Sequence, residues 1–479
     1  MKSDKIGIKL EKAAGCTVTW DRYMLDFYSV DASSYKLKPQ VIAFPRNEKD
    51  IAKIIRFAKK HLIPVTPRGG GTGLVGGALG KGIILDMRNF NKIKIGKNHV
   101  TVGSGVYKGH LDKILQKQGR FVGPDPSIGP FCTIGGMVGN NSSGVHSLKY
   151  GSVIDNLIEV KIMDSTGNAT RLQNMYHSIK SNISQDVIKS FPRVSKNSCG
   201  YRIDRVLSEK DVHKLIAGSE GTLGIITSAK LRTYKMPKSK SLCIIHYKTL
   251  LQASIDSAKI LTLKPAALEV IDKNITRHIK MKIPNSGCLI FAEFDNDIKH
   301  NIKQIQKITS GKIIKVESNK GNIRKLWSFR NSALALSLRS ITKKETMPTL
   351  IEDSVVPVKR LPLLLNMLDM IEKKYHLRTI VYGHIGNGNL HIRPVLGYKD
   401  ISKIQKIATE FFTGVIGIGG SITGEHGDGL ARSEFVKTQY GDKTYAVFRN
   451  IKQQFDPQNI LNPGKIISDK KTMIKNLKI

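Results

Sequence analysis

The sequence predicts a mixed α+β protein with more than one domain. The chain has 479 residues, which exceeds what one hydrophobic core usually organises. Helical and strand-like patterns are interleaved along it, and the pattern changes character near residue 241. A hydrophobic content of 40% and a charged content of 24% are those of an ordinary globular protein.

The first recognisable unit is strand–helix–strand. PQVIAFP at 39–45 and IPVTP at 63–67 read as short strands. Between them Asn47 can cap a helix over 48–62 that carries Ile51, Ile54, Ile55 and Ala58 on one face. Two strands and a helix within thirty residues indicate a small α/β unit.

More strands follow before a linker. GIILDM, HVTVGSGV and TLGIITSAKLRTYKMP are strand-like, and 152–171 read as a strand and a turn at Ser165–Thr166–Gly167. The prolines and lysines at 237–240 resemble a linker. We therefore expect an N-terminal helical extension over 1–35 and a first domain over 36–237.

The second domain is expected over 238–424. Helical patterns such as LQASIDSAKILTL and LPLLLNMLDMIEKKYHL alternate there with strands such as GCLIFAEFD. The tail AVFRNIKQQFDPQNILNPGKI reads as a helix and a turn that stops at Pro463–Gly464. It belongs to a C-terminal segment, 425–479.

The net charge of +39 is unusual. It is compatible with nucleic acid, an anionic membrane surface or an anionic substrate, or with a general over-use of lysine. The lysines are dispersed, without a basic tail or a repeated basic–aromatic register, so we predict no nucleic-acid partner.

Five cysteines at 16, 132, 199, 243 and 288 are too far apart for CxxC zinc sites or clustered iron–sulfur ligands. Their odd, scattered arrangement indicates a reducing compartment, so we expect a cytoplasmic protein. The sequence has no signal peptide pattern and no apolar run of about eighteen residues, the length that a membrane span needs.

Residues 63–80, IPVTPRGGGTGLVGGALG, form a loop of almost bare backbone. Gly71, Gly73 and Gly76 satisfy GxGxxG, but a strand follows instead of the helix that a Rossmann fingerprint requires. The loop can wrap a phosphate closely with its N–H groups, and Arg68 adds a positive charge. The alternative is a flexible surface loop. Two more glycine-rich stretches, at 123–151 and 218–225, favour a large flat ligand with a pyrophosphate, such as a flavin dinucleotide.

In this order, PRGGGTGL, PDPS, CTIGGMVGNNSSG, KNSCGY and GSEGTLGI resemble the FAD-binding domain of the vanillyl-alcohol oxidase (PCMH-type) superfamily, in its D-lactate dehydrogenase and glycolate oxidase branch. The resemblance covers nearly the whole chain. It implies a two-subdomain PCMH-type FAD-binding domain, an α+β cap domain with an antiparallel sheet that binds the substrate, and a C-terminal segment that returns to the FAD domain.

The resemblance also implies the residues that contact FAD. Arg68 to Leu74 would hold the pyrophosphate, and the loop has no histidine for a covalent flavin link, so FAD is expected to be non-covalent. The full set implied is Pro67, Arg68, Gly69, Gly70, Gly71, Thr72, Gly73, Leu74, Asp125, Pro126, Thr133, Gly135, Gly136, Gly139, Asn140, Ser143, Gly144, Glu220, Gly224, Ile225 and Asn462.

A second site is predicted at 379–394, TIVYGHIGNGNLHIRP. Asn387–Gly388 favours a two-residue type I′ turn, which would place His384 directly opposite His391. Opposed side chains at this distance can share a divalent metal. The alternative is two unrelated loop histidines. In GGSITGEHGDGL, Glu425 can complete a two-histidine site and His426 can accept a proton.

The same resemblance implies that His384, His391 and Glu425 bind Zn²⁺ or another divalent ion and that His426 is the catalytic base. Many relatives have aspartate where this chain has Asn387. KLWSFRNSALAL resembles an element whose arginine, here Arg330, binds the substrate carboxylate. Lys343 and Lys344 are out of register for a second carboxylate contact.

These parts predict oxidation of a D-2-hydroxy acid, with Arg330, His384 and His426 at the substrate and hydride transfer to flavin N5. The electrons would pass to a separate acceptor, namely a quinone, a carrier protein or an iron–sulfur subunit. Alternatives are a glycolate oxidase flavoprotein subunit that is active only in a complex, and a cofactor-binding sensor without catalysis. The basic surface leaves open a peripheral position on the inner face of the membrane.

Overall fold

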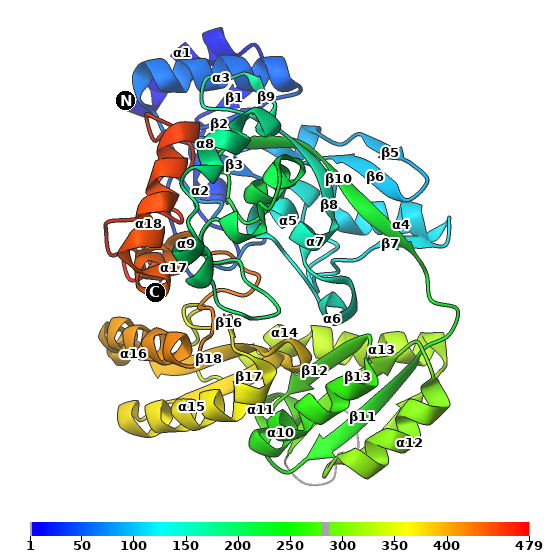
Figure 1. Ribbon diagram of the computed structural model, residues 1–479. Helices are drawn as coiled ribbons and strands as arrows, with labels where there is room; N and C mark the ends of the chain where they lie inside the picture. The colour runs from blue at the N-terminus through cyan, green and yellow to red at the C-terminus, as the bar shows by residue number, and fades with distance from the viewer. Residues whose placement is uncertain (1, 279–286, 479) are drawn as a thin grey trace.

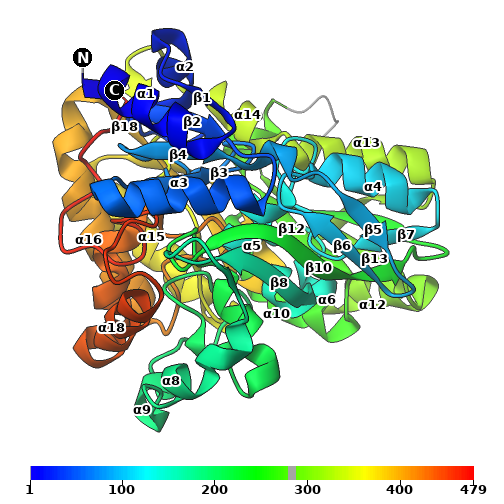
Figure 2. The same cartoon turned by 90° about the horizontal axis from the view of Figure 1, so that it is seen from above.

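Three sheets organise the computed structural model, which describes residues 2–278 and 287–478 (Figure 1). Two of them belong to the upper half of the molecule in Figure 1, and the third forms the lower half with its own helices. Viewed from above, the first and second sheets lie side by side (Figure 2). The mixed α+β class predicted from the sequence is confirmed.

The first sheet contains the predicted strand–helix–strand unit. Its order is β1-β2-β4-β3, with β1 antiparallel at the edge and the others parallel. The strands are β1 (Thr17–Thr19), β2 (Val41–Phe44), β3 (Val65–Arg68) and β4 (Ile83–Asp86). As predicted, the Asn47 side chain accepts a hydrogen bond from the Asp50 N–H and caps α3 (Glu48–His61), which packs against α1 (Lys2–Ala14).

The glycine-rich loop connects β3 directly to β4, two adjacent parallel strands. In a Rossmann unit a helix would make this crossover. Here residues 69–82 make it as open loop, which leaves their backbone free to line a cavity. A short helix, α2 (Arg22–Tyr28), lies beside this sheet.

The second sheet is antiparallel, with the order β5-β6-β10-β8-β9 and β7 pairing the far end of β10. Its strands are β5 (Ile93–Ile95), β6 (His99–Gly103), β7 (Arg120–Val122), β8 (Leu157–Met163), β9 (Ala169–Thr170) and β10 (Ile225–Lys235). Its associated helices are α4 (Lys108–Gln116), α5 (Ile134–Asn140), α6 (Ser147–Tyr150), α7 (Val153–Asn156), α8 (Tyr176–Lys180) and α9 (Gln185–Lys189). Helix α5 packs on β10.

The third sheet is antiparallel, in the order β14-β11-β13-β12-β17-β18-β15, with β16 pairing the start of β18. Its strands are β11 (Ser241–Tyr247), β12 (Ala267–Ile271), β13 (Cys288–Phe294), β14 (Lys312–Glu317), β15 (Glu345–Thr346), β16 (Ser354–Val355), β17 (Arg378–His384) and β18 (Asn389–Gly397).

Helices cover both faces of this third sheet. One face packs against α10 (Leu250–Ile260), α12 (Ile298–Ile308), α15 (Leu361–Tyr375) and α16 (Ile404–Gly417). The other face carries α11 (Lys273–Thr276), α13 (Lys320–Asn331) and α14 (Ala333–Leu338). In Figure 1, α13 and α14 lie on the side of the sheet that faces the first two sheets.

The C-terminal segment contains α17 (Gly429–Arg432) and α18 (Val436–Phe455) and ends beside the first sheet. Leu461 forms a parallel bridge with Val65, and the Asn462 amide donates to the backbone carbonyls of Gly77 and Glu220. The end of the chain therefore returns to the glycine-rich loops, as expected for this fold class.

A charged cluster joins the two halves. His146 contacts Asp125 Oδ2 at 2.5 Å through Nδ1 and Glu293 Oε1 at 3.0 Å through Nε2. Glu293, on β13, also accepts from Trp327 Nε1 at 2.7 Å and pairs with Lys240 at 3.1 Å. Burial opposes protonation of His146, but the two carboxylates outweigh it and raise the pKa of His146 to about 10.

Candidate active site

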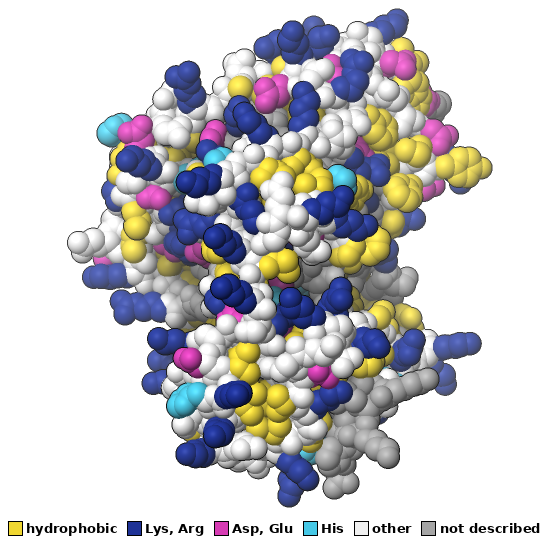
Figure 3. All heavy atoms as spheres, turned by 90° about the vertical axis from the view of Figure 1, so that its right-hand side faces the viewer, with side chains coloured by type: hydrophobic (Ala, Val, Ile, Leu, Met, Phe, Trp, Pro, Cys, Tyr) yellow, Lys and Arg dark blue, Asp and Glu magenta, His cyan; other side chains and the backbone are white. Residues whose placement is uncertain are grey.

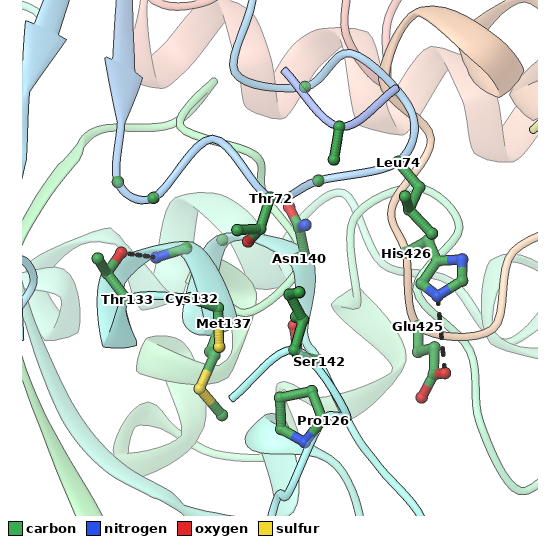
Figure 4. A pocket seen from close by; sticks show the side chains of 18 of the residues that line it. Thr72, Leu74, Pro126, Cys132, Thr133, Met137, Asn140, Ser142, Glu425 and His426 are labelled. Atoms are coloured by element: carbon green, nitrogen blue, oxygen red, sulfur yellow. Dashed lines mark hydrogen bonds and ion pairs between the residues drawn. The ribbon is translucent and has the colours of Figure 1, made fainter. Parts of the chain in front are cut away.

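A cavity of about 510 Å³ lies between the glycine-rich loops and the third sheet. The loop after β3, helix α5 and the segment 142–145 line one side. The end of α13, helix α14, the β17–β18 hairpin and the loop before α17 line the other. Figure 4 shows Glu425 and His426 across from Asn140, Ser142 and Pro126. The predicted cofactor loops and the predicted metal site thus share one space.

Most residues predicted for the two sites line this cavity. They are Pro67, Arg68, Gly69, Gly70, Gly71, Thr72, Gly73, Leu74, Pro126, Thr133, Gly135, Gly136, Gly139, Asn140, Ser143, Gly144, Glu220, Arg330, His384, His391, Glu425 and His426. Cavity-lining residues that the sequence reasoning did not single out include Ser104, Ile226, Asn331, Leu334 and Tyr382.

Four predicted residues do not line the cavity. Asp125 contacts His146. Gly224 and Ile225 lie beside β8, and the next residue, Ile226, lines the cavity. Asn462 donates hydrogen bonds to the backbone of the glycine-rich loops from outside the cavity. Their roles as direct contacts to a cofactor stay predictions.

Arg68 lines the cavity, but its guanidinium is turned to the protein. It donates to the backbone carbonyls of Tyr28 at 3.1 Å and Val30 at 2.8 Å, and it lies over the Tyr28 ring. Its charge therefore also ties the glycine-rich loop to α2.

The glycines at the cavity wall leave room that a larger residue would fill. A Cβ added to Gly73 would have only Asn140 Nδ2 near it, at 3.7 Å, and one added to Gly136 only Thr133 Oγ1, at 3.5 Å. Both would project into the cavity. A wall of exposed backbone at the N-terminal end of α5 suits the phosphates and ring of FAD.

The β17–β18 hairpin brings the two histidines together, but not in the predicted register. Tyr382 is opposite His391, and His384 is opposite Asn389, so the two-residue turn predicted at Asn387–Gly388 is wrong. Residues Ile385–Asn387 form a 3-10 turn with Gly388 left-handed, which makes a four-residue connection.

Tertiary contacts impose this longer turn. The Val356 N–H donates to the Gly388 carbonyl, the Ser195 hydroxyl donates to the Asn387 carbonyl, and Val355 pairs with Asn389. A register shift of two residues keeps every side chain on the same face. The imidazoles of His384 and His391 are therefore diagonal neighbours, with ring centroids 5.2 Å apart.

Three imidazoles present their Nε2 atoms to one carboxylate oxygen. Glu425 Oε1 lies 2.9 Å from His384 Nε2, 3.5 Å from His391 Nε2 and 3.8 Å from His426 Nε2. Each ring has an acceptor at Nδ1: Glu269 Oε1 at 2.7 Å, the Glu352 carbonyl at 3.3 Å and Glu352 Oε1 at 2.7 Å, respectively.

With Nδ1–H donating in each ring, the three Nε2 lone pairs and Glu425 Oε1 converge without a donor between them. A proton or a cation must stand there. Two ligand atoms at about 2.1 Å from a shared tetrahedral centre lie about 3.4 Å apart, and the separations from His384 and His391 to Glu425, 2.9 and 3.5 Å, are close to this. The donor set fits a divalent metal.

The other oxygen of Glu425 is held from the opposite side. Buried Lys196 donates to Oε2 at 3.0 Å and to Asn389 Oδ1 at 3.3 Å, and the Ser143 hydroxyl also donates to Oε2. Ser143 belongs to a predicted flavin loop, so this loop and Glu425 are directly connected.

Asp353 also lies near, and its ligand atoms group with those of His391, Glu425 and His426 within 4.8 Å. However, its Oδ2 accepts from the backbone N–H groups of Gly424, Glu425 and His426 at 3.0, 2.9 and 2.9 Å. Its Oδ1 accepts from the Asn389 amide at 3.1 Å. Asp353 therefore fixes the backbone of 424–426, and His384 is the better third partner for a metal.

Burial and neighbouring charged groups shift the pKa values of His391 and His426 in opposite directions. Burial, His426 and His384 lower the pKa of His391 to about 3, which keeps its ring neutral. Burial would lower the pKa of His426, but the carboxylates of Glu352 and Asp353 raise it to about 9. His426 therefore has a higher proton affinity than an ordinary imidazole, while His391 has the free lone pair of a metal ligand.

Arg330 reaches the cavity from the end of α13. It is 3% exposed and pairs with Glu269, whose other oxygen holds His384. Arg330 Nη2 makes the ion pair with Glu269, while Nε has no hydrogen-bond partner among the described residues. A buried guanidinium with a free donor at a cavity wall can bind a carboxylate. Lys343 and Lys344 are exposed and do not line the cavity.

The sequence reasoning missed Lys196, Glu269 and Glu352. Glu269 is a charge inside the apolar strand ALEVI, and Glu352 with Asp353 interrupts the apolar run TLIEDSVVP. A charge in such a setting indicates a buried partner, and this signal could have marked both as members of a site. Lys196 lies in KNSCGY, which carried the resemblance but no assigned role.

Two family models match the chain. One, described as "FAD binding domain", matches residues 39–173, and the other, "FAD linked oxidases, C-terminal domain", matches residues 236–466. The first covers β2, β3 and β4 of the first sheet and part of the second sheet, and the other covers the whole third sheet and the loop that contains Glu425 and His426.

Curated relatives are similar along most of the chain. The glycolate oxidase subunit GlcD of Bacillus subtilis is 29% identical over 463 residues, 92% of each chain. D-lactate dehydrogenase of Anaerostipes hadrus is 28% identical over 467 residues, again 92% of each. D-2-hydroxyglutarate dehydrogenase of Escherichia coli is 27% identical, and the match covers 91% of this chain but 49% of that protein, about half its length.

Solved structures share the fold. An alkyldihydroxyacetonephosphate synthase superposes with a TM-score of 0.66 at 19% identity, covering 94% of this chain and 82% of the other. A BBE-like 1 protein of Physcomitrella patens gives 0.65 at 15% identity, covering 98% and 99%. At these identities the likeness concerns the fold alone.

Proposed function

Because this chain belongs to the FAD-linked oxidases, we propose that it is a dehydrogenase that oxidises a D-2-hydroxy acid of the D-lactate type to the 2-oxo acid. The single observation that carries the proposal is the shared cavity: the FAD loops form one wall, and Arg330 with the three imidazoles forms the other. A hydroxy acid between the two walls would have its carboxylate near Arg330, its hydroxyl near the three imidazoles and its α-hydrogen facing the FAD wall.

When bound, non-covalent FAD supplies the acceptor for a hydride at N5, and a divalent cation, best matched by Zn²⁺, supplies a Lewis acid for the 2-hydroxyl. His384, His391 and Glu425 would hold the cation. Arg330 binds the substrate carboxylate and fixes its orientation. His426 Nε2, aimed into the cavity, accepts the hydroxyl proton.

The walls near Arg330 favour a monocarboxylate with a small apolar side chain. Leu334, Ala335 and Leu338 line the cavity beside it. Arg68 and Arg330 are the lysine or arginine side chains among the described lining residues, and Arg68 lies at the cofactor end. A second substrate carboxylate would have no such partner near Arg330, which argues against D-2-hydroxyglutarate as the preferred substrate.

The electrons would leave to a separate acceptor, a quinone, a carrier protein or an iron–sulfur subunit. All five cysteines are free and far apart in sequence, so they offer no cluster site. Within the described residues no helix is both long and apolar enough to cross a bilayer. Lys and Arg predominate over Asp and Glu on the face in Figure 3, which would suit a peripheral, salt-sensitive contact with an anionic bilayer.

The second candidate is a glycolate oxidase flavoprotein subunit that needs partner subunits. It is favoured by the end-to-end similarity to the Bacillus subtilis subunit. One experiment tests both. The purified chain, loaded with FAD and Zn²⁺ under anaerobic conditions, is mixed with D-lactate, L-lactate or glycolate, and the flavin absorbance near 450 nm, its usual oxidised band, is followed.

Bleaching by D-lactate and not by L-lactate supports the proposal. Bleaching by glycolate alone, or only after partner subunits are added, supports the second candidate. No bleaching by any 2-hydroxy acid refutes both.

A further inference from the structure

His426 is held on three sides before any substrate enters. Its ring stacks on that of His391 with centroids 5.0 Å apart and an interplanar angle of 11°. Its backbone N–H donates to Asp353 Oδ2 at 2.9 Å, and its Nδ1 lies 2.7 Å from Glu352 Oε1. These contacts leave Nε2 as the ring nitrogen that faces the cavity.

Glu352 can only accept at that contact. It is fully buried, and Arg432 Nη2 lies 3.0 Å from its Oε1 while Arg393 Nη2 lies 3.3 Å from its Oε2. Two guanidiniums around one carboxyl group require a carboxylate, which has no proton to donate. The proton at the 2.7 Å contact therefore belongs to His426 Nδ1, and the lone pair of the neutral ring is at Nε2.

We propose that Glu352 is the positioning residue that fixes the proton of His426 on Nδ1 and thereby makes Nε2 the proton acceptor. The inference rests on the proposed function for its chemical meaning. In that step the O–H bond of the 2-hydroxyl breaks and its proton goes to Nε2. The electron pair of the α C–H bond goes to FAD, which is reduced by two electrons, and the C=O bond of the 2-oxo acid forms.

Asp353 does not compete for this role. Its nearer oxygen is 3.9 Å from His426 Nδ1 and already accepts three backbone N–H groups. Arg393 and Arg432 neutralise Glu352, so the carboxylate stays in place whether the ring is neutral or charged. Glu352 would also stabilise the imidazolium that exists once the hydroxyl proton has been taken.

The first test reads the proton position without any turnover. The holoenzyme is labelled with ¹⁵N-histidine, and His426 is identified among the 13 histidines by its loss in His426→Gln. The two-bond ¹H–¹⁵N correlation pattern distinguishes the ring nitrogens. The spectra are recorded above the pKa of His426, about 9, so that the ring is neutral. A proton on Nδ1 is expected, and a bare Nδ1 with the proton on Nε2 overturns the proposal.

The second test separates positioning from binding. Stopped-flow reduction of the flavin by D-lactate gives the limiting rate and the apparent dissociation constant of the acid. Glu352→Gln removes the negative charge that orients the Nδ1–H group and stabilises the imidazolium, so the limiting rate is expected to fall about 100-fold or more, within the range of general-base contributions. The dissociation constant should change less than about threefold, since Arg330 is untouched.

Glu372→Gln is the matched control. Glu372 is a half-buried glutamate of the same half of the molecule that accepts from the Thr379 N–H at 2.6 Å, away from the cavity. The limiting rate of flavin reduction in Glu372→Gln should equal that of the unaltered protein. Wild-type rates in Glu352→Gln, or an equal loss in both variants, would overturn the role. If Glu352→Gln does not fold, the NMR result decides alone. A wild-type protein that no 2-hydroxy acid reduces would instead refute the proposed function and leave the tautomer result standing.

Discussion

Gly136 lies on the cavity side of α5, and its replacement by alanine should separate cofactor binding from folding. The residue is exposed to the cavity and its backbone is helical. An added methyl group would meet only Thr133 Oγ1 at 3.5 Å, an ordinary contact. No residue in the described part of the chain opposes the substitution, whereas a flavin nucleotide in the cavity would.

The two effects have opposite signs. Alanine in place of glycine in a helix stabilises the folded chain by about 0.5–1 kcal/mol. Forcing a methyl group into a close-packed contact costs about 1–3 kcal/mol, which corresponds to a roughly 5- to 150-fold weaker FAD affinity. Gly136→Ala should therefore be at least as stable as the unaltered protein without FAD and clearly weaker in binding it.

Gly135→Ala is the control because the neighbouring glycine faces the other way. A Cβ there would lie 2.6 Å from Ser104 Cβ and 2.9 Å from the Ser104 carbonyl, so the protein itself must shift. This variant should lose stability even without cofactor.

Urea unfolding of the cofactor-free proteins by circular dichroism gives the stabilities, and quenching of flavin fluorescence gives the FAD dissociation constants. Wild-type FAD affinity in Gly136→Ala would refute the assignment of this wall to FAD. A loss of stability as large as in Gly135→Ala would refute the geometry.

Three further predictions concern buried charges. Lys196→Met should destabilise the metal-free protein by about 3 kcal/mol, because Glu425 loses its ammonium partner. Added Zn²⁺ should restore part of this stability in thermal melts, and an unchanged stability would refute the role of the Lys196–Glu425 ion pair. Glu269→Gln should weaken Zn²⁺ binding about 10- to 100-fold through His384, as measured by competition with a chelator, and an unchanged affinity would contradict it. Because the raised pKa of His146 (about 10, ordinarily 6.5) stabilises the folded state in the protonated form, the stability lost in His146→Gln should be largest below pH 6.5 and vanish as pH rises through about 10. Urea unfolding midpoints measured across this pH range check the prediction. A stability loss in His146→Gln that grows as pH rises would contradict it.

Local structure followed from local sequence. Asn47 caps α3, the strands on either side of it form, and the loop 69–82 stays open because its glycines and the following strand exclude a crossover helix. The bare backbone of the glycine-rich loops could be read in the same way, whereas the individual residues expected to contact FAD were implied by the family resemblance. Most residues predicted for it line the cavity.

Only the tertiary structure decided how the buried charges are paired. Glu269 meets Arg330 and His384, Lys196 meets Glu425, and in each pair the two residues are tens to hundreds of positions apart, so no spacing rule connects them. The hairpin register was decided in the same way, because β16 and the loop at Ser195 compete with the intrinsic preference of Asn387–Gly388.

Sequence by itself determined that residues 69–82 would present bare backbone and that His384 and His391 would lie on one face of a hairpin, since residue type and face are local properties. Packing then determined which nitrogen of each ring faces the cavity. That choice depends on an acceptor at Nδ1, and for His426 the acceptor comes from a segment 74 positions away.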